Sequence, residues 1–472
     1  MAFSRSLLRN NLRLCTLDGV MATPICFVLQ PGNFVIAAML VSLYRVPPAV
    51  YGMIVSLPFW CNFLQAGLTP IITQFAQPKT LAVWSAAAQC FFLGLLTLVL
   101  SALPIDRPEL SGPWFVLFFG VLGMTMAFSG VGWISWVQEW VPSRLSGRYF
   151  GMRNRIGQIM AVTFLLTIGF VLDALNRTAL AFQVVLGSTV LMRIASVWFQ
   201  HKTITPRSTK DQNQLPWREQ LEALRERPAY FWFIAYGACW GFAANLFGAF
   251  YPVFMYEQLG LSIKFVSTIQ ILAGLGAAVS FPAWGALTDR FGNKPIMIVC
   301  MIAWQLQNFA WCFLTPENAK LLYAMWIFGG VVSAGFILGL FNIQLRIIPP
   351  AAKTLAISIN LAVTSLVTAI APILGGSILQ YLLNTGTEPL SVYHQLFIVP
   401  PAVAILGCGL LRRVKEPNSA PLSIVIGAMR NARTLGGIIG LTQLANFIFV
   451  KSSKAWGRPS THSPVISSGK EP

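Results

Sequence analysis

The chain contains a series of apolar segments, each long enough to cross a lipid bilayer as a helix. A spanning helix needs about 20 mostly apolar residues, because each residue advances the helix by about 1.5 Å. We predict spans at 17–43, 50–70, 80–103, 113–139, 154–175, 178–199, 229–258, 263–286, 295–314, 319–345, 354–383 and 391–412. The predicted fold class is therefore an all-α polytopic membrane protein with about twelve transmembrane helices.

The composition excludes a large soluble domain. Of the 472 residues, 56% are hydrophobic and only 10% are charged. A soluble domain carries roughly 25% charged residues, which cover its water-facing surface. A single hydrophobic core also stops growing at about 250–300 residues, so it could not absorb this apolar surplus. We therefore expect the lipid bilayer to be the partner that surrounds this apolar surface.

The positions of the basic residues predict the orientation. The net charge is +18, but the lysines and arginines lie in short gaps between apolar runs, so we expect no nucleic-acid partner. With the N-terminus in the cytoplasm, 27 of the 33 lie on the cytoplasmic side and five in the outer loops. We expect a multi-pass monomer of the plasma (inner) membrane, with both termini cytoplasmic.

The longest gap divides the spans six and six. We predict an N-terminal half at 1–199, a cytoplasmic linker with a short amphipathic helix at 200–228, a C-terminal half at 229–412, and a cytoplasmic tail with an interfacial helix at 413–472. The loop PIITQFAQPK (70–79) aligns with GALTDRFGNK (285–294). Such an internal repeat is typical of transporters built by duplication.

These loops carry a resemblance to the major facilitator superfamily. The segment 285–294 resembles that family's short cytoplasmic signature, GxLxDRxGRK, and VPSRLSGRYFG (141–151) is similar to its loop after span four. The resemblance implies two six-helix halves that move a small solute by alternating access. A non-transporting member, acting in membrane assembly, sensing or lipid handling, stays open as the alternative. The signature residues concerned are Gly285, Asp289, Arg290, Gly292, Lys294, Arg144 and Arg148.

The resemblance also implies a conformational latch in this signature. Asp289 lies at a helix end, where its carboxylate would pair with a basic side chain or a helix N-terminus. Gly285 and Gly292 would allow close helix approach and a tight turn. The alternative is a solvated turn that only marks topology. Asn293 replaces the family's first basic residue, and the first-half copy has the neutral Gln74 and Phe75.

The family's solute cavity lies between the halves, near the middle of the bilayer. The sequence Gln30-Pro31-Gly32-Asn33 falls in the middle of span one, where proline and glycine free backbone carbonyls. We therefore propose Gln30 and Asn33 as substrate-binding residues, with a packing kink as the alternative. Further candidates, each of which could equally be a packing residue, are Trp133, Trp136, Tyr236, Trp240, Asn245 and Gln270.

Charged residues are rare inside the predicted spans. Asp18 falls about 18 Å from the centre of span one, which favours an interfacial cap. Arg193 lies inside span six, where an intramembrane charge is a functional candidate. The alternative, which we favour, is that its side chain reaches the cytoplasmic surface. No carboxylate or histidine lies at mid-depth, so we expect either uniport or ion coupling through Asp18. The neutral, tryptophan-rich interior further suggests a neutral, amphiphilic or apolar solute rather than a strongly charged one.

Enzymatic chemistry finds no support in the sequence. The chain has no GxSxG, HExxH or paired carboxylates at the spacing that hydrolytic sites need. The three histidines and eight cysteines are scattered, without the spacing of metal ligands. We therefore expect no catalytic residues, no metal site and no cofactor.

Overall fold

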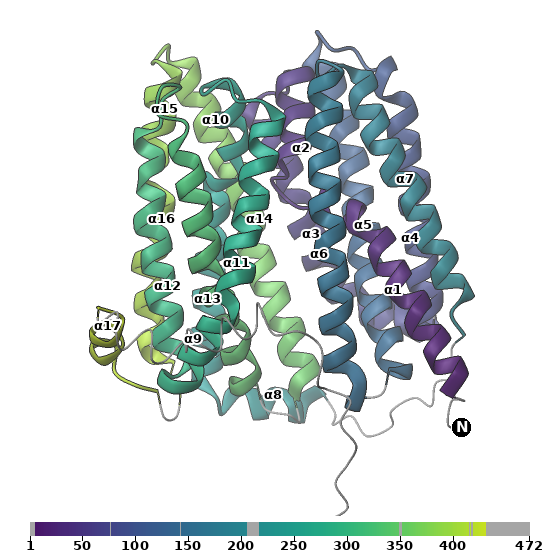
Figure 1. The fold of residues 1–472 in the computed structure, drawn as a ribbon, viewed down its shortest axis with the longest axis vertical. Coiled ribbons are helices and arrows are strands. Elements are labelled where there is room, and N and C mark those ends of the chain that lie inside the picture. The colour runs from purple at the N-terminus through teal and green to yellow at the C-terminus, as the bar shows by residue number, and fades with distance from the viewer. Residues whose placement is uncertain are drawn as a thin grey trace, which may run out of the picture.

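The computed structural model describes residues 5–75, 77–141, 143–204, 217–348, 352–414, 416 and 419–430, which form a bundle of long helices (Figure 1). Within these ranges the chain contains no β-strand. Eleven helices are long and apolar enough to span a membrane, and a shorter apolar stretch, Phe34–Leu43, completes the first predicted span. The prediction of about twelve spanning segments in an all-α fold is confirmed.

The first half contains spans one to six. Its elements are α1 (Arg5–Val28), α2 (Phe34–Ala37), the π-helix η1 (Ala38–Leu43), α3 (Pro48–Phe75), α4 (Pro78–Val99), η2 (Leu100–Ala102), α5 (Pro108–Trp140), α6 (Ser143–Ala174) and α7 (Ala179–Lys202). Helix α1 begins at Arg5 rather than near residue 17, and α6 begins at Ser143 rather than near residue 154. Both helices therefore extend past the apolar runs that predicted them, into polar sequence.

The second half repeats this arrangement after the short helix α8 (Trp217–Arg225), which lies inside the predicted linker. Its elements are α9 (Pro228–Leu246), η3 (Gly248–Phe250), α10 (Tyr251–Glu257), α11 (Ile263–Phe291), α12 (Asn293–Asn308), η4 (Phe309–Phe313), α13 (Leu321–Ile347), α14 (Lys353–Asn384), α15 (Pro389–Leu396), α16 (Val399–Gly407), η6 (Cys408–Arg413) and α17 (Leu422–Arg430). The rest of the predicted tail, 431–472, lies outside the described residues.

The two ends of the bundle differ, and we name them by their residues. The basic end holds the start of α1 and helix α8, whereas the far end holds Arg45, Arg107 and Arg177 in the turns between spans (Figure 1). The break predicted in span one is confirmed between the two ends. Helix α1 ends at Val28, and Gly32 adopts a φ of +65°, which glycine tolerates without strain.

The internal repeat has a structural counterpart at the basic end. Lys79, at the start of α4, donates through Nζ to the carbonyl oxygen of Thr203, just past α7, at 2.7 Å. Lys294, at the start of α12, donates to the carbonyl oxygen of Val414, just past η6, at 2.8 Å. The two lysines that the sequence alignment pairs therefore bind the ends of spans six and twelve, respectively, in the same way.

The halves pack against each other through α3 with α14 and α6 with α11. A Cβ added to Gly52 of α3 would lie 2.1 Å from the carbonyl oxygen of Pro372, and one added to Gly376 of α14 would lie 2.4 Å from that of Pro48. A real Cβ atom does not approach an oxygen so closely, so these glycines allow the two backbones to touch.

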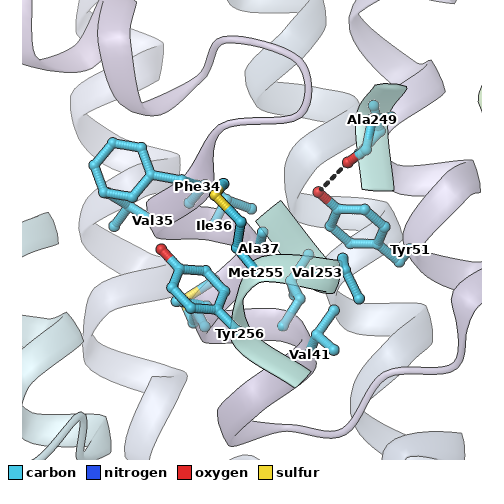
Figure 2. Packing of buried hydrophobic residues seen from close by; sticks show 14 of the residues in the cluster. Phe34, Val35, Ile36, Ala37, Val41, Tyr51, Ala249, Val253, Met255 and Tyr256 are labelled. Carbon is cyan, nitrogen blue, oxygen red and sulfur yellow. Dashed lines mark hydrogen bonds between the residues drawn. The ribbon is translucent and has the colours of Figure 1, made fainter. Parts of the chain in front are cut away.

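Further contacts between the halves lie toward the same far end. Tyr51 donates its hydroxyl to the carbonyl oxygen of Ala249 at 3.1 Å, and α10 packs against α2 and η1 in a buried apolar cluster (Figure 2). Beyond this cluster, Arg177 donates to the carbonyl oxygen of Leu261 at 3.1 Å. The hydrogen bonds that we describe between the halves therefore join them at the far end.

The glycine contact predicts the effect of one added methyl group. In Gly52→Ala, α3 and α14 must separate, at a cost of about 1–3 kcal/mol. We expect amide hydrogen exchange at residues 44–50 and 376–388 to become about tenfold faster. Gly67→Ala is the matched control, because a Cβ at Gly67, on the same helix, meets nothing within 4 Å. Equal exchange in both variants would show that this close contact does not hold the halves together.

Candidate functional site

A buried carboxylate lies inside the first half. Asp18 is 2% exposed and accepts three hydrogen bonds, from Trp133 Nε1 at 2.9 Å, Ser196 Oγ at 2.7 Å and Gln200 Nε2 at 2.9 Å. The predicted interfacial cap is wrong, because α1 begins at Arg5 and places Asp18 well inside the helix. The bundle thus supplies the donors that an anion needs away from water.

A buried cation belongs to the same network. Arg193 is 4% exposed and donates to Gln89 Oε1 at 2.8 Å, Ser129 Oγ at 2.9 Å and Ser196 Oγ at 2.9 Å. The expected reach to the membrane surface is wrong, because α4, α5 and α7 provide acceptors within the bundle. The hydroxyl of Ser196 connects Arg193 with Asp18, so the two opposite charges share one hydrogen-bonded chain.

A second cation extends the network toward a polar hollow. The guanidinium of Arg153 lies 4.4 Å from the ring centre of Trp133, and its Nε donates to the carbonyl oxygen of Cys15 at 3.3 Å. A Cβ on Gly19 would lie 2.3 Å from this guanidinium. The guanidinium therefore packs directly against the α1 backbone, where a side chain would not fit. The hollow has a volume of about 260 Å³, and its lining includes Arg153, Thr23, Asn154 and Gln158.

Sequence reasoning missed Arg153 for an identifiable reason. The apolar run predicted that span five begins near residue 154, which assigned Arg153 to a loop. Helix α6 instead begins at Ser143, so Arg153 lies in its third turn, facing α1. The polar sequence RNRIGQ has a helical spacing that places Arg153 and Gly157 on one face, and this spacing was the signal available.

The broken segment of span one is held by its own residues. Asn33 is 7% exposed; its Oδ1 accepts from the Val35 amide at 2.8 Å and its Nδ2 donates to the carbonyl oxygen of Phe27 at 2.9 Å. Gln30 is exposed, and both residues line a small cavity of about 20 Å³, large enough for one water. The break is therefore stabilised by an asparagine cap, and a solute role for Gln30 or Asn33 stays a prediction.

The aromatic candidates of span seven face the interior of the second half. Tyr236 is fully buried, and both Tyr236 and Trp240 pack against Phe336 of α13, with ring centres 6.5 and 5.0 Å apart, respectively. Their common neighbour confirms that they share a helix face. Asn245 donates to the carbonyl oxygen of Gly241 in its own helix at 2.9 Å.

The remaining substrate candidates are dispersed. Trp136 is 1% exposed and packs beside Trp140 in the first half, with Lys79 Nζ 5.7 Å from its ring centre. Gln270 of α11 is half-buried. Of the predicted set, the structure places Trp133 in the charged network and does not bring the other five aromatic and amide candidates of spans four, seven and eight to it.

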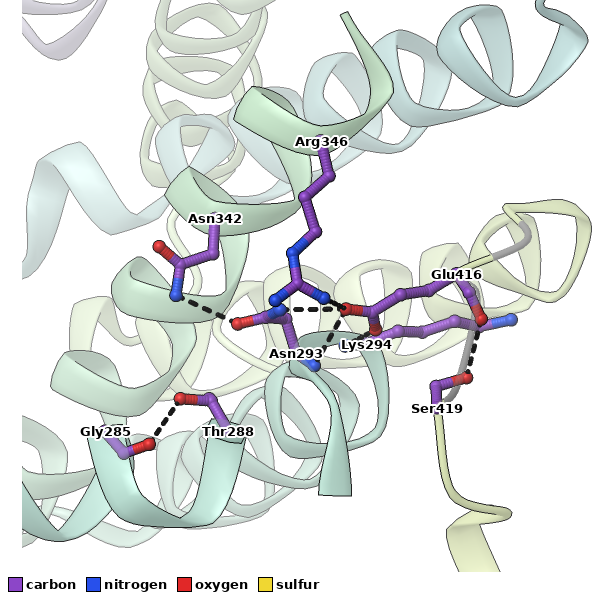
Figure 3. Close-up of polar contacts among 8 residues, drawn as sticks. All are labelled: Gly285, Thr288, Asn293, Lys294, Asn342, Arg346, Glu416 and Ser419. Carbon is purple, nitrogen blue, oxygen red and sulfur yellow. Dashed lines mark hydrogen bonds and ion pairs between the residues drawn. The ribbon is translucent and has the colours of Figure 1, made fainter. Parts of the chain in front are cut away.

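A second polar cluster lies at the basic end, where Glu416 binds the start of α12 (Figure 3). Its carboxylate accepts from the backbone amides of Asn293 at 3.1 Å and Lys294 at 2.7 Å, and from Arg346 Nη1 at 3.0 Å. The side chain of Glu416 is only 3% exposed. An anion at a helix N-terminus is stabilised by the unpaired amides and the helix dipole.

The contact with a basic side chain and a helix N-terminus that was expected of Asp289 is made by Glu416 instead, and a latching role stays a prediction. Asp289 is exposed, and its carboxylate makes no hydrogen bond or ion pair to any described residue. Asn293, the departure from the family signature, donates its side-chain amide to Glu416 at 2.8 Å and accepts from Asn342 at 2.9 Å (Figure 3). The neutral residue thus joins α12 to both α13 and the segment after span twelve.

The other signature residues have different surroundings. Gly292 forms the predicted tight turn with a φ of +92°, and a Cβ there would lie 2.9 Å from that of Ser419. Gly285 faces open space, so the close approach expected there is absent among the described residues. Arg290 lies 5.6 Å from the ring centre of Phe291. The side chains of Arg144 and Arg148, in the first turns of α6, lie outside the described part of the structure.

The comparisons agree with this architecture. The sequence profile of the Major Facilitator Superfamily matches twice, over residues 24–273 and 241–455. A D-xylose–proton symporter is 12% identical with a TM-score of 0.67, covering 87% of this chain and 99% of its own. The nucleoside transporter NupG is 14% identical with a TM-score of 0.62 and covers the same shares. No curated protein matches the sequence.

A third solved structure covers more of the chain. The bacterial homologue of the human lysosomal transporter Spinster, in an inward-facing conformation, is 14% identical with a TM-score of 0.56, over 93% of this chain and 98% of its own. The chain is thus a multi-pass integral membrane protein of twelve-span architecture whose structural neighbours are transporters. It belongs to the major facilitator superfamily.

The charged network predicts the effect of neutralising its acid. In Asp18→Asn an amide N–H replaces an acceptor and points at a donor, which leaves buried donors unpaired at about 1–3 kcal/mol. We expect a melting temperature a few degrees below that of the wild type in the same detergent. The control is Asp106→Asn, at an exposed carboxylate of the far end. Equal melting of both variants would contradict the structural role of Asp18.

The basic-end cluster predicts a contrast between two acids. Glu416→Gln removes the negative charge that Arg346 and the α12 N-terminus share, at about 1–3 kcal/mol. We expect faster amide exchange in residues 292–296 and 419–425 by about tenfold. Asp289→Asn, at the exposed signature acid, should leave both segments unchanged. The reverse order of effects would return the latch to Asp289.

Proposed function

We propose that this protein is a secondary transporter that moves a small solute between its two halves by alternating access. The observation that carries the proposal is the contact between the halves, which passes through Gly52 and Gly376 at the far end. At this contact the backbones of α3 and α14 pack closely, and no covalent bond joins them. The two halves could therefore pack together in one conformation and separate in another. The transporters among the structural neighbours support the same activity.

The orientation follows from charge. The basic end carries most of the lysines and arginines, and cytoplasmic loops are enriched in these residues. We therefore assign the basic end, with both termini, to the cytoplasm, and the protein to the plasma (inner) membrane. In this orientation the halves are joined on the outer side, and the solute exchanges with the cytoplasmic side.

The polar hollow beside Arg153 favours a solute with oxygen acceptors. It joins the Arg153 guanidinium with the side-chain amides of Asn154 and Gln158, which donate to such groups, whereas the Thr23 hydroxyl donates to the Gly19 carbonyl oxygen at 2.9 Å. This narrows our expectation of a neutral, amphiphilic or apolar solute, which rested on the neutral, tryptophan-rich interior of the spans. Several of these rings pack inside one half instead.

Ion coupling, if present, would involve Asp18. It is a membrane-embedded carboxylate enclosed by donors, and Trp133 connects it to the Arg153 guanidinium at the hollow. A solute that binds Arg153 would move Trp133 and so change the surroundings of Asp18. The other mode is uniport, in which the solute never accumulates against its gradient.

The test is counterflow in proteoliposomes, with solutes first selected by thermal shift. A ligand at 100 times its dissociation constant adds about 2.7 kcal/mol of stability. We expect labelled solute to exchange through the wild type, and Asp18→Asn to lose accumulation while it retains exchange. Arg153→Gln should weaken solute binding by about tenfold, because it removes a charged hydrogen bond. A folded protein that exchanges none of the stabilising solutes would favour the non-transporting alternative.

A further inference from the structure

A groove on the outer surface of the second half is separate from the polar hollow beside Arg153, which α1 and α6 of the first half line. It has a volume of about 530 Å³ and lies between α12 and the α16–η6 segment, with residues 419–422 across its basic end. In Figure 1 these elements form the outer edge of the bundle, with α17 beside them. The groove therefore faces the bilayer rather than the partner half.

The walls and the mouth of the groove differ in chemistry. Ile298 and Ile302 of α12 and Ile405 of α16 form an apolar wall. Lys294 and Arg412 lie at the basic end of the same groove, at the level where lipid headgroups would lie. The residues from Lys294 to Ile302 extend over about 12 Å of helix, enough for a headgroup contact and several methylene groups below it.

The nearby acid, Glu416, already forms an ion pair with Arg346, so these two cations leave the net charge here positive. Both Glu416 oxygens are already used, by the amides of Asn293 and Lys294 and by Arg346. The Lys294 ammonium donates one hydrogen bond, to the Val414 carbonyl oxygen, and an ammonium has three donors. Arg412 is exposed. The mouth thus presents a positive charge above an apolar wall.

Residues 419–422, which cross the basic end of the groove, are fixed in place. The Ala420 amide donates to the carbonyl oxygen of Phe291 at 2.8 Å, and Val425 of α17 is fully buried in the core of the second half. Ile424 and Ile426, on either side of Val425, are 55% and 45% exposed. An anchored helix with exposed apolar side chains beside basic residues is typical of the membrane interface.

From this arrangement we infer that the groove binds one anionic phospholipid of the leaflet at the basic end. The phosphate contacts Lys294 and Arg412, and an acyl chain lies along Ile298, Ile302 and Ile405. Juxtamembrane basic residues attract anionic lipid through charge, and the apolar wall adds burial of methylene groups. This binding does not depend on transport activity.

The test is native mass spectrometry of the full chain, titrated in detergent with phosphatidylglycerol or phosphatidylcholine of identical acyl chains. We expect one phosphatidylglycerol to remain bound more tightly than phosphatidylcholine. Arg412→Gln should weaken phosphatidylglycerol about fivefold and phosphatidylcholine less, because the choline ammonium already offsets the phosphate charge. Ile298→Phe, which fills the wall, should weaken both lipids.

Arg413→Gln is the matched control, because the neighbouring Arg413 lies over the ring of Trp232 at 4.6 Å and does not line the groove. Its lipid affinities should equal those of the wild type. Equal retention of the two lipids by the wild type, or equal effects of Arg412→Gln and Arg413→Gln, would overturn the inference. Arg412 is exposed, so its variant is expected to fold even if Ile298→Phe does not.

Discussion

The hydrocarbon core of a bilayer offers no hydrogen-bond partners, and this constraint governs the polar groups inside the spanning segments. Backbone groups are satisfied within helices, and the break in span one persists because Asn33 binds the groups that it frees. The same rule applies to Asp18 and Arg193, which are buried away from water, and Ser196 hydrogen-bonds to both of these opposite charges, which lipid would not stabilise. The charged groups in the interior of the first half are thus hydrogen-bonded, although the Gln200 Oε1 beside them has no partner among the described residues.

The halves meet by a different principle. Lipid tails are as apolar as the helix surfaces, so burial alone gives little reason for two helices to associate in a membrane. Gly52 and Gly376 instead let α3 and α14 approach to backbone contact, where dispersion and weak polar interactions accumulate. Association of this kind depends on shape, which explains why these positions are glycines.

The fold could be predicted from the sequence because a spanning helix has a length set by the bilayer. The site could be predicted only in part. Asp18 was found but misplaced, and Arg153 was missed, because hydropathy reports where a helix leaves the apolar layer and not where it begins. Glu416 escaped notice because its role depends on a helix start 123 residues away, which no local pattern records. The break at Pro31 was predictable because proline and glycine act locally.

The two lysine contacts at the basic end have a mechanical consequence. Lys79 fastens the third helix of the first half to the end of the sixth, and Lys294 does the same in the second half. Each half is therefore held together at the basic end, opposite the far-end contacts that join the two halves. A half held in this way resists shear between its own helices. Under the proposed alternating access, the contact at the far end would therefore be where the two halves bend relative to each other.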